Sequence, residues 1–235
     1  MKTPREHLTF AGSLTGGVHV KQPPLLEAQE KQVAVLFVDI EGCTQLCEDL
    51  PPKEMTGLIE RYFSRFFDSV EKAGGRVNNI MGDGFMALFE GKEYRKNILA
   101  AAEAAVTIQR RARALNKQRS GEHGPVLVNA GIHVGSAYVG ITNFRTVGGE
   151  HWTYTASGPV INVAARLCDL ATKGSIFVSA EIAKNLKGIR YSLQRLGAKK
   201  LKNVSQPETV FKLNTKKTRP GRSKKATGRG PSSEE

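Results

Sequence analysis

The alternation of apolar and polar residues divides the first third of the chain into a strand, a helix and a hairpin. An unbroken apolar run over residues 33–38 predicts a strand that is buried on both faces. Pro51 and Pro52 open a predicted helix, in which large apolar residues recur about every 3.6 residues until Gly74-Gly75 ends it. Two apolar arms then flank the turn Gly82-Asp83-Gly84, which predicts a β-hairpin.

The rest of the pattern completes an α+β arrangement. A second amphipathic helix is predicted from about residue 95 to residue 117, with its Arg and Lys side chains on the solvent face. The elements predicted after it are strands at 126–134 and 137–141, joined at Gly135-Ser136, a helix at 158–170, a strand at 175–179 and a short helix at 181–186. The order strand, helix, hairpin, helix, strand predicts a ferredoxin-like βαββαβ core with C-terminal additions.

Length and charge place this core in one domain with two loose ends. A chain of 235 residues with 40% hydrophobic content can form one sizeable core, which we assign to residues 31–213. Residues 1–30 lack sustained periodicity and are interpreted as a flexible leader. Residues 214–235 hold seven Lys or Arg against two Glu, so they contribute +5 to the net charge of +13. We expect them to form a disordered basic tail.

Charge, cysteines and hydropathy indicate which partners and which cellular compartment the protein can have. The basic balance favours anionic partners without choosing among nucleotides, nucleic acid and acidic lipids. Cys43, Cys47 and Cys168 have no metal-ligand spacing and are expected to be free thiols in a reducing compartment. No apolar stretch approaches the roughly 20 residues that span a bilayer, and the N-terminus has no hydrophobic signal core. These features predict a cytoplasmic protein without a membrane span.

Two aspartates are candidate metal ligands. Asp39 ends the buried strand, where a carboxylate must be paired, neutralised or bound to a cation, and Asp83 lies in the Gly-Asp-Gly turn. If the strand and the hairpin are neighbours, the two carboxylates meet at one point. Paired carboxylates among oxygen ligands hold Mg²⁺ beside substrate phosphates. Taken alone, each aspartate is also typical of an ordinary helix cap or tight turn.

Three segments resemble the signature motifs of the class III nucleotidyl cyclases. Residues 37–44, Phe-Val-Asp-Ile-Glu-Gly-Cys-Thr, are similar to the first metal motif of that family, and residues 79–87 are similar to the second. Residues 154–167 are similar to the family's Asn-and-Arg signature. The resemblance covers about residues 32 to 213. It implies the class III cyclase fold and the conversion of a nucleoside triphosphate to a 3′,5′-cyclic nucleotide and pyrophosphate.

The resemblance also implies a two-metal site. Asp39 and Asp83 would bridge two Mg²⁺ or Mn²⁺ ions, which promote phosphoryl chemistry, and the backbone carbonyl of Ile40 would be a further metal contact. The backbone amides from Gly42 to Thr44 lead into a helix and are expected to cradle the β- and γ-phosphates.

Asn162 and Arg166 are the candidate catalytic residues. They are four residues apart, so they lie on one face of the predicted helix and can reach the same substrate. In the family these positions orient the ribose and stabilise charge on the α-phosphate, a role that suits the permanently charged guanidinium of Arg166. Lys202 resembles a phosphate-binding lysine. Taken alone, Arg166 is also compatible with a surface ion pair. The family implies a head-to-tail homodimer, in which the metal ligands act from one protomer. These three residues, together with Asn79 and Thr155, act from its partner.

Asn79 and Thr155 occupy the positions that read the base in the family. Adenylate cyclases of this class typically use Lys with Asp or Thr, whereas guanylate cyclases use Glu with a small residue or Cys. Because an Asn side chain both donates and accepts, Asn79 and Thr155 can read adenine, and ATP is the expected substrate. Asn79 in place of Lys is one departure from the family pattern. Two further departures are Cys43, which is in the phosphate-binding segment where Phe is usual, and Ser157-Gly158-Pro159, which replaces a stretch that commonly contains Gly-Asp.

Several alternatives stay open at this point. The departures are also compatible with a degenerate cyclase-fold module that binds nucleotide or a regulatory partner without turnover, or with a guanylate or relaxed-specificity cyclase. The basic tail permits non-specific binding of nucleic acid, although the sequence has no zinc-ligand spacing or aromatic-rich RNA-binding motif. Members of the family often carry sensor domains upstream, so an upstream sensor or regulatory partner is a further expectation.

Overall fold

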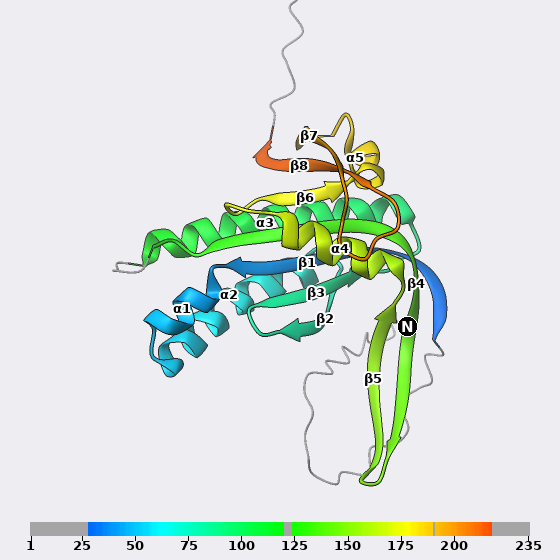
Figure 1. The fold of residues 1–235 in the computed structure, drawn as a ribbon, viewed down its shortest axis with the longest axis horizontal. Coiled ribbons are helices and arrows are strands. Elements are labelled where there is room, and N and C mark those ends of the chain that lie inside the picture. The colour runs from blue at the N-terminus through cyan, green and yellow to red at the C-terminus, as the bar shows by residue number, and fades with distance from the viewer. Residues whose placement is uncertain (1–27, 120–123, 190, 218–235) are drawn as a thin grey trace, which may run out of the picture.

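The computed structural model describes residues 28–119, 124–189 and 191–217 (Figure 1). Within these residues the chain forms eight strands and five helices. In chain order they are β1 (Gln29–Glu41), α1 (Cys43–Asp49), α2 (Pro52–Lys72), β2 (Arg76–Met81), β3 (Gly84–Phe89), α3 (Tyr94–Gln118), β4 (Leu127–Thr146), β5 (Gly149–Ser157), α4 (Pro159–Leu170), β6 (Ile176–Ser179), α5 (Ala180–Leu186), β7 (Tyr191–Lys199) and β8 (Glu208–Lys217). Most of the predicted leader and tail lies outside the described residues, and β1 and β8 each extend a few residues beyond the predicted domain boundaries.

The strands form one mixed sheet in the order β2-β3-β1-β4-β6-β8-β7, and β5 pairs with β4 off this path. β1 lies antiparallel to both β3 and β4, and β2 and β3 form the predicted hairpin. These four strands have the order and directions of a ferredoxin-like βαββαβ core. The predicted α+β fold class is therefore confirmed, and β6, β7 and β8 are C-terminal additions to that core.

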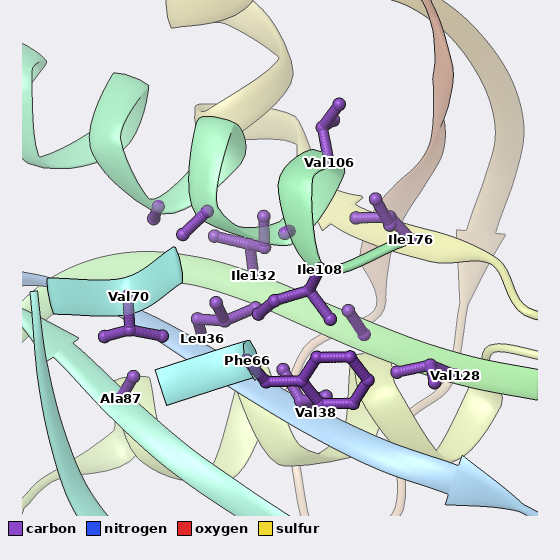
Figure 2. Packing of buried hydrophobic residues seen from close by; sticks show 14 of the residues in the cluster. Leu36, Val38, Phe66, Val70, Ala87, Val106, Ile108, Val128, Ile132 and Ile176 are labelled. Atoms are coloured by element: carbon purple, nitrogen blue, oxygen red, sulfur yellow. The ribbon is translucent and has the colours of Figure 1, made fainter. Parts of the chain in front are cut away.

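The larger hydrophobic core lies between the sheet and the helices α2 and α3, which cover the same face (Figure 1). Phe66 of α2 and Ile108 of α3 meet Leu36 of β1 and Ile132 of β4 in this layer (Figure 2). All four side chains are fully buried. Each such burial stabilises the fold by about 1.5–3 kcal/mol. The layer therefore fixes the course of β1 and the place where Asp39 emerges.

Helix α4 covers the opposite face of the sheet and packs directly on β4 (Figure 1). A Cβ atom at Gly131 of β4 would lie 2.3 Å from both the carbonyl oxygen of Ala164 and the amide nitrogen of Cys168. Only glycine lets the helix and the strand approach this closely. Val160 and Ala164 also pack in one cluster with Val35 of β1. Thus α4 is held against the two central strands.

β4 is a single strand of 20 residues, so the predicted division into two strands at Gly135-Ser136 is wrong. The first part of β1 runs alongside this segment, with Val33 opposite Gly135 and Gln32 opposite Ser136. Gln32 Nε2 also donates to Ser136 Oγ at 2.8 Å. This cross-strand pairing outweighs the turn preference of a Gly-Ser pair. β4 continues into a hairpin with β5 that projects from the body (Figure 1), an element that the hydrophobic pattern did not predict.

Two further expectations concern the cysteines and the membrane. Cys43, Cys47 and Cys168 are free thiols, as predicted, and only Cys47 is exposed. No helix in the described ranges is long and apolar enough to cross a bilayer.

Candidate active site

The two candidate metal acids lie together at the ends of adjacent strands. Asp39 is near the end of β1, and Asp83 is in the turn between β2 and β3. Asp39 is the register partner of Gly84, the residue after Asp83. The backbone amide of Ile40 donates to the carbonyl oxygen of Asp83 at 3.0 Å. The strand and the hairpin are therefore neighbours, which is the arrangement that lets the two carboxylates meet.

The acid pair carries unbalanced negative charge. The pKa of Asp39 is raised to about 6, first by burial and then by the charges of Asp83, Asp169 and Glu41. Among the described residues, no basic side chain forms an ion pair with Asp39 or Asp83. A cation bound between the two acids would offset this charge.

The donor set fits a divalent ion that keeps part of its coordination shell for other ligands. In the part of the chain that the structure describes, no three His, Cys, Asp or Glu side chains gather into a metal-binding group. Two carboxylates beside a backbone carbonyl are nevertheless sufficient for Mg²⁺, because water and substrate phosphates usually supply its remaining oxygens. Asp39, Asp83 and the carbonyl of Ile40 are the groups that would hold such an ion.

The predicted phosphate-binding segment adjoins Asp83. Gly42 has a left-handed backbone conformation with φ +73°, and α1 begins at the next residue. The first amides of a helix lack partners within it, and no described side chain caps α1. Thr44 is exposed, whereas Cys43 is buried. The pKa of the Cys43 thiol is raised to about 12 by burial and then by the charge of Asp83. This thiol is therefore close to the turn that carries Asp83.

Gly84 and Glu41 support the acid pair, although they were not selected from the sequence. A Cβ atom at residue 84 would lie 2.8 Å from a backbone carbonyl of β1 and 3.1 Å from Oδ1 of Asp39, so glycine makes room for the carboxylate. Glu41 Oε2 accepts hydrogen bonds from Asn129 Nδ2 and from the amide of Gly174, each at 3.2 Å. It ties the end of β1 to β4 and to the loop after α4. The Gly-Asp-Gly sequence contained the signal for Gly84, but a lone Glu after a strand gives none.

Helix α4 carries the two candidate catalytic residues. Asn162 is exposed and Arg166 is partly buried. The guanidinium of Arg166 donates to Asp169 Oδ2 at 2.6 Å, so the ion pair that the sequence left open is present. Asp169 was not selected from the sequence, although i,i+3 spacing on a helix brings such side chains together. Because only one guanidinium nitrogen bonds Asp169, other donors of Arg166 can reach a phosphate.

Lys202 lies in the turn between β7 and β8, close to α4. The preceding residue, Leu201, is buried in a cluster with Val163 and Leu167 of α4, whereas Lys202 itself is exposed. The lysine is therefore on the side of the sheet that carries Arg166.

The two predicted base-reading residues lie on different strands. Asn79 is exposed on β2, next to a register shift in the pairing with β3. Thr155 is on β5, where its hydroxyl lies 2.7 Å from the hydroxyl of Thr142 and shares a hydrogen bond with it. β2 and β5 approach each other where the guanidinium carbon of Arg76 lies 4.8 Å from the centre of the Tyr154 ring. Their strands are thus neighbours, and no hydrogen bond between described residues joins Asn79 to Thr155.

Apart from Asn79 on β2 and Thr155 on β5, the predicted site residues form two groups within the chain. The metal group comprises Asp39, Ile40, Asp83 and the amides of Gly42, Cys43 and Thr44, and the α4 group comprises Asn162, Arg166 and Lys202. Within the described ranges, no hydrogen bond or ion pair joins the two groups. Their connection is electrostatic, because the carboxylate of Asp169 is close enough to raise the pKa of Asp39.

This fold, with paired acids at the end of β1 and the adjacent hairpin turn, is that of a nucleotidyl cyclase domain. Residues 26–215 match the adenylate and guanylate cyclase catalytic domain. The chain therefore belongs to the family of adenylate and guanylate cyclase catalytic domains.

Solved structures and a curated relative agree with this assignment. The adenylyl cyclase CyaB from P. aeruginosa is similar with a TM-score of 0.74 and 26% identity, over 86% of this chain and 100% of that one. The guanylyl cyclase Cya2 is similar with a TM-score of 0.70 and 25% identity, over 79% of this chain and 93% of that one. An uncharacterized protein of Mycobacterium tuberculosis is 31% identical over 192 residues, which are 80% of this chain and 33% of that protein. The chain thus spans about a third of the length of this relative.

Proposed function

We propose that this chain is an adenylate cyclase domain, which converts ATP to 3′,5′-cyclic AMP and pyrophosphate with two Mg²⁺ or Mn²⁺ ions. The observation that carries the proposal is the convergence of Asp39 and Asp83, whose segments are joined by the 3.0 Å hydrogen bond from Ile40 to Asp83. This pair lies beside the start of α1 in a chain of the cyclase family. Carboxylates for a cation next to free amides for phosphate can together hold a metal–triphosphate complex.

The metal group has the task of holding the triphosphate. Asp39, Asp83 and the carbonyl of Ile40 would bind the divalent ions. When bound, these ions offset the triphosphate charge and favour loss of the proton from the ribose 3′-hydroxyl. The amides from Gly42 to Thr44 bind the β- and γ-phosphates and so retain the leaving pyrophosphate.

The α4 group acts on the sugar and on the α-phosphate. Asn162 orients the ribose so that its 3′-oxygen faces the α-phosphorus. Arg166 stabilises the charge on the α-phosphate while the new phosphorus–oxygen bond forms and the bond to pyrophosphate breaks. Lys202 binds phosphate oxygens from the same side.

A head-to-tail homodimer is part of the proposal. Two observations support it. The metal group and the α4 group are separate within one chain, and the projecting β4–β5 hairpin exposes the apolar rings of Tyr138 and Phe144, at 58% and 53% of their surface. Exposed aromatic side chains are enriched at protein interfaces. In such a dimer the metal group of each protomer faces the α4 group of its partner, which gives two equivalent sites.

ATP is the proposed substrate because of Asn79 and Thr155. Both side chains can donate and accept, which matches the N1 acceptor and the 6-amino donor of adenine. An amide can also turn to serve guanine, so a relaxed-specificity or guanylate cyclase is the second candidate. The similar structures include an adenylyl and a guanylyl cyclase, which leaves the choice of base to these two residues.

The proposed setting is the cytoplasm, where the substrate is available, under the control of an upstream sensor or regulatory partner. The greater length of the mycobacterial relative supports further domains in proteins of this kind. Non-specific binding of nucleic acid would be confined to the basic tail, of which residues 218–235 lie outside the described part of the chain.

A product assay tests the proposal. The purified full chain is incubated with ATP or GTP and with Mg²⁺ or Mn²⁺, and the products are identified by mass. The expected result is 3′,5′-cyclic AMP with pyrophosphate, formed faster than cyclic GMP. Cyclic GMP in equal or greater yield would establish relaxed or guanylate specificity. Nucleotide binding without a cyclic product under any combination would establish a binding module and overturn the proposal.

A further inference from the structure

Four side chains from separate parts of the sheet interlock on the face that carries α4. They are Lys31 of β1, Arg76 of β2, Glu90 directly after β3 and Tyr154 of β5, and we name them the Tyr154 network. The Tyr154 hydroxyl donates to Glu90 Oε1 at 2.6 Å, and Lys31 Nζ donates to Glu90 Oε2 at 2.8 Å. The guanidinium of Arg76 covers the Tyr154 ring at 4.8 Å. Both carboxylate oxygens of Glu90 therefore have a partner.

Three members of the network, Lys31, Glu90 and Tyr154, are partly buried, whereas Arg76 is exposed. The side chains of Glu90 and Lys31 are only 17% and 29% exposed. The Tyr154 ring packs against the cluster that contains Val35 and Leu88. Burial and then the Glu90 carboxylate raise the pKa of Tyr154, so its hydroxyl keeps the proton that it donates. In such partly desolvated surroundings a satisfied polar network specifies one arrangement of its members.

The network lies next to both proposed base-reading residues. Tyr154 directly precedes Thr155, and Arg76 precedes Asn79 by three residues on β2. The pairing of β2 with β3 shifts register between Val77 and Asn79, so the regular ladder is interrupted at this point. β5 pairs only with β4 among the described strands. The ladders thus connect β2 to β5 only through β3, β1 and β4, and the Tyr154 network adds a direct side-chain contact between the two strands.

We propose that Tyr154 and Glu90 are positioning residues, which set the discrimination between adenine and guanine by holding Asn79 and Thr155 at a fixed separation. This inference rests on the proposed function, because it takes those two residues to read the base. Glu90 acts through Tyr154 and Lys31 rather than on the nucleotide. Discrimination by hydrogen bonds depends on such support, since a small displacement leaves a polar group of the base without its partner.

Two substitutions and one matched control test the inference. Tyr154→Phe removes the hydroxyl but keeps the ring beneath Arg76. Glu90→Gln keeps an acceptor for Tyr154 but removes the ion pair with Lys31. The control is Tyr62→Phe, which removes another sheltered hydroxyl, donated to Asn116 Oδ1 at 2.8 Å on the opposite face of the sheet. The kcat and KM of the purified full chain are measured with ATP and with GTP for each variant.

In Tyr154→Phe we expect the ATP-to-GTP ratio of kcat/KM to fall about fivefold, mainly through a higher KM for ATP, as for the loss of one hydrogen bond. Glu90→Gln should lower the ratio less. Tyr62→Phe should change the ATP-to-GTP ratio less than about twofold. It should lower the melting temperature by about as much as Tyr154→Phe does. An unchanged ratio in Tyr154→Phe, or a wild-type ratio close to one, would overturn the inference.

A binding measurement separates this inference from the proposed function. The rise in melting temperature with ATP or GTP, each with Mg²⁺, reports base preference without turnover. If the wild type forms no cyclic product, the proposed function is wrong, but a smaller preference for ATP binding in Tyr154→Phe would still support the positioning role. If the wild type cyclises ATP and neither ratio changes in the variant, the positioning role is wrong and the proposed function stands. A wild type that binds neither nucleotide would overturn both.

Discussion

The backbone amide of Ile40 donates to the carbonyl oxygen of Asp83 at 3.0 Å. This bond joins the strand that carries one candidate metal acid to the turn that carries the other, and it uses neither carboxylate. The separation of Asp39 and Asp83 is therefore set by the backbone. Their proximity contributes, after burial, to the rise in the pKa of Asp39.

The first prediction concerns the two acids. We expect Asp39→Asn and Asp83→Asn each to lower kcat by at least about a hundredfold, because each removes a charged ligand from a site that must offset developing charge. The fold should persist, and Asp39→Asn should not lower the melting temperature near pH 8, since it removes a partly desolvated charge. Activity and thermal unfolding measure these effects, with Asp68→Asn as the control, which changes a partly exposed acid of α2 that pairs with Arg111 of α3. Wild-type turnover in either site variant would refute the metal assignment.

The second prediction concerns pH. The pKa of Asp39 is raised from 3.8 to about 6. In the pH window between these two values, the Asp39 carboxyl of the folded metal-free chain holds a proton, which a cation must displace. Metal affinity should therefore fall as the pH drops below about 6. The same shift makes the free energy of unfolding of the metal-free protein decrease as the pH rises through the window, because the folded state binds more protons than the unfolded state. Melting temperatures measured across this pH range, with and without Mg²⁺, check both effects. If both pH dependences persist in Asp39→Asn, they do not come from the Asp39 carboxyl.

The third prediction compares two glycines. Gly84→Ala places a Cβ atom 2.8 Å from a backbone carbonyl and 3.1 Å from Oδ1 of Asp39, so we expect a loss of about 1–3 kcal/mol in the free energy of unfolding and weaker metal binding. Gly57→Ala in α2 meets nothing within 4 Å and should instead stabilise the protein by about 0.5–1 kcal/mol. Chemical denaturation with and without Mg²⁺ measures both. Equal effects of the two substitutions would show that residue 84 is not crowded.

The acid pair and the central fold could be predicted from the sequence because their signals are short. An apolar run that ends in Asp39 and a Gly-Asp-Gly turn each occupy a few residues, and the order of elements then brings them to adjacent strands. The roles of Asn162 and Arg166 rest on the family motif, and they stay predictions.

Other features depend on contacts between distant residues, so no local pattern encodes them. The Gly135-Ser136 pair was interpreted as a turn, but β4 continues through it because β1 extends far enough to pair with both residues. The hydrogen bond from Tyr154 to Glu90 joins residues 64 positions apart. The need for glycine at position 131 likewise arises only because α4 packs directly against it. Packing across the sheet determines these features.

The fourth prediction concerns base choice. Asn79→Lys should raise the ATP-to-GTP ratio of kcat/KM, since an ammonium group can donate to adenine N1 but meets a protonated N1 in guanine. Asn79 is exposed on β2, so the longer side chain should not disturb the core. Steady-state kinetics with both nucleotides measures the ratio. If the ratio stays at the wild-type value, Asn79 does not contact the base.

The fifth prediction concerns assembly. In the proposed dimer, the metal group of one protomer and the α4 group of its partner form each site. Asp39→Asn and Arg166→Ala should therefore each inactivate the homodimer, because every site contains the altered residue. In a mixed dimer, one site has both defects and the other site has neither. Mixing the two inactive proteins should restore activity.

The expected recovery follows from random exchange of subunits. About half of the dimers are then mixed and each has one intact site of two, so activity should reach up to about a quarter of the wild-type value. Subunit exchange is verified separately by mass spectrometry of differently tagged chains. A site built within one chain gives no recovery, because every chain in the mixture carries a defect. If exchange is complete and the mixture stays inactive, the composite site is wrong, even when each single variant behaves as predicted.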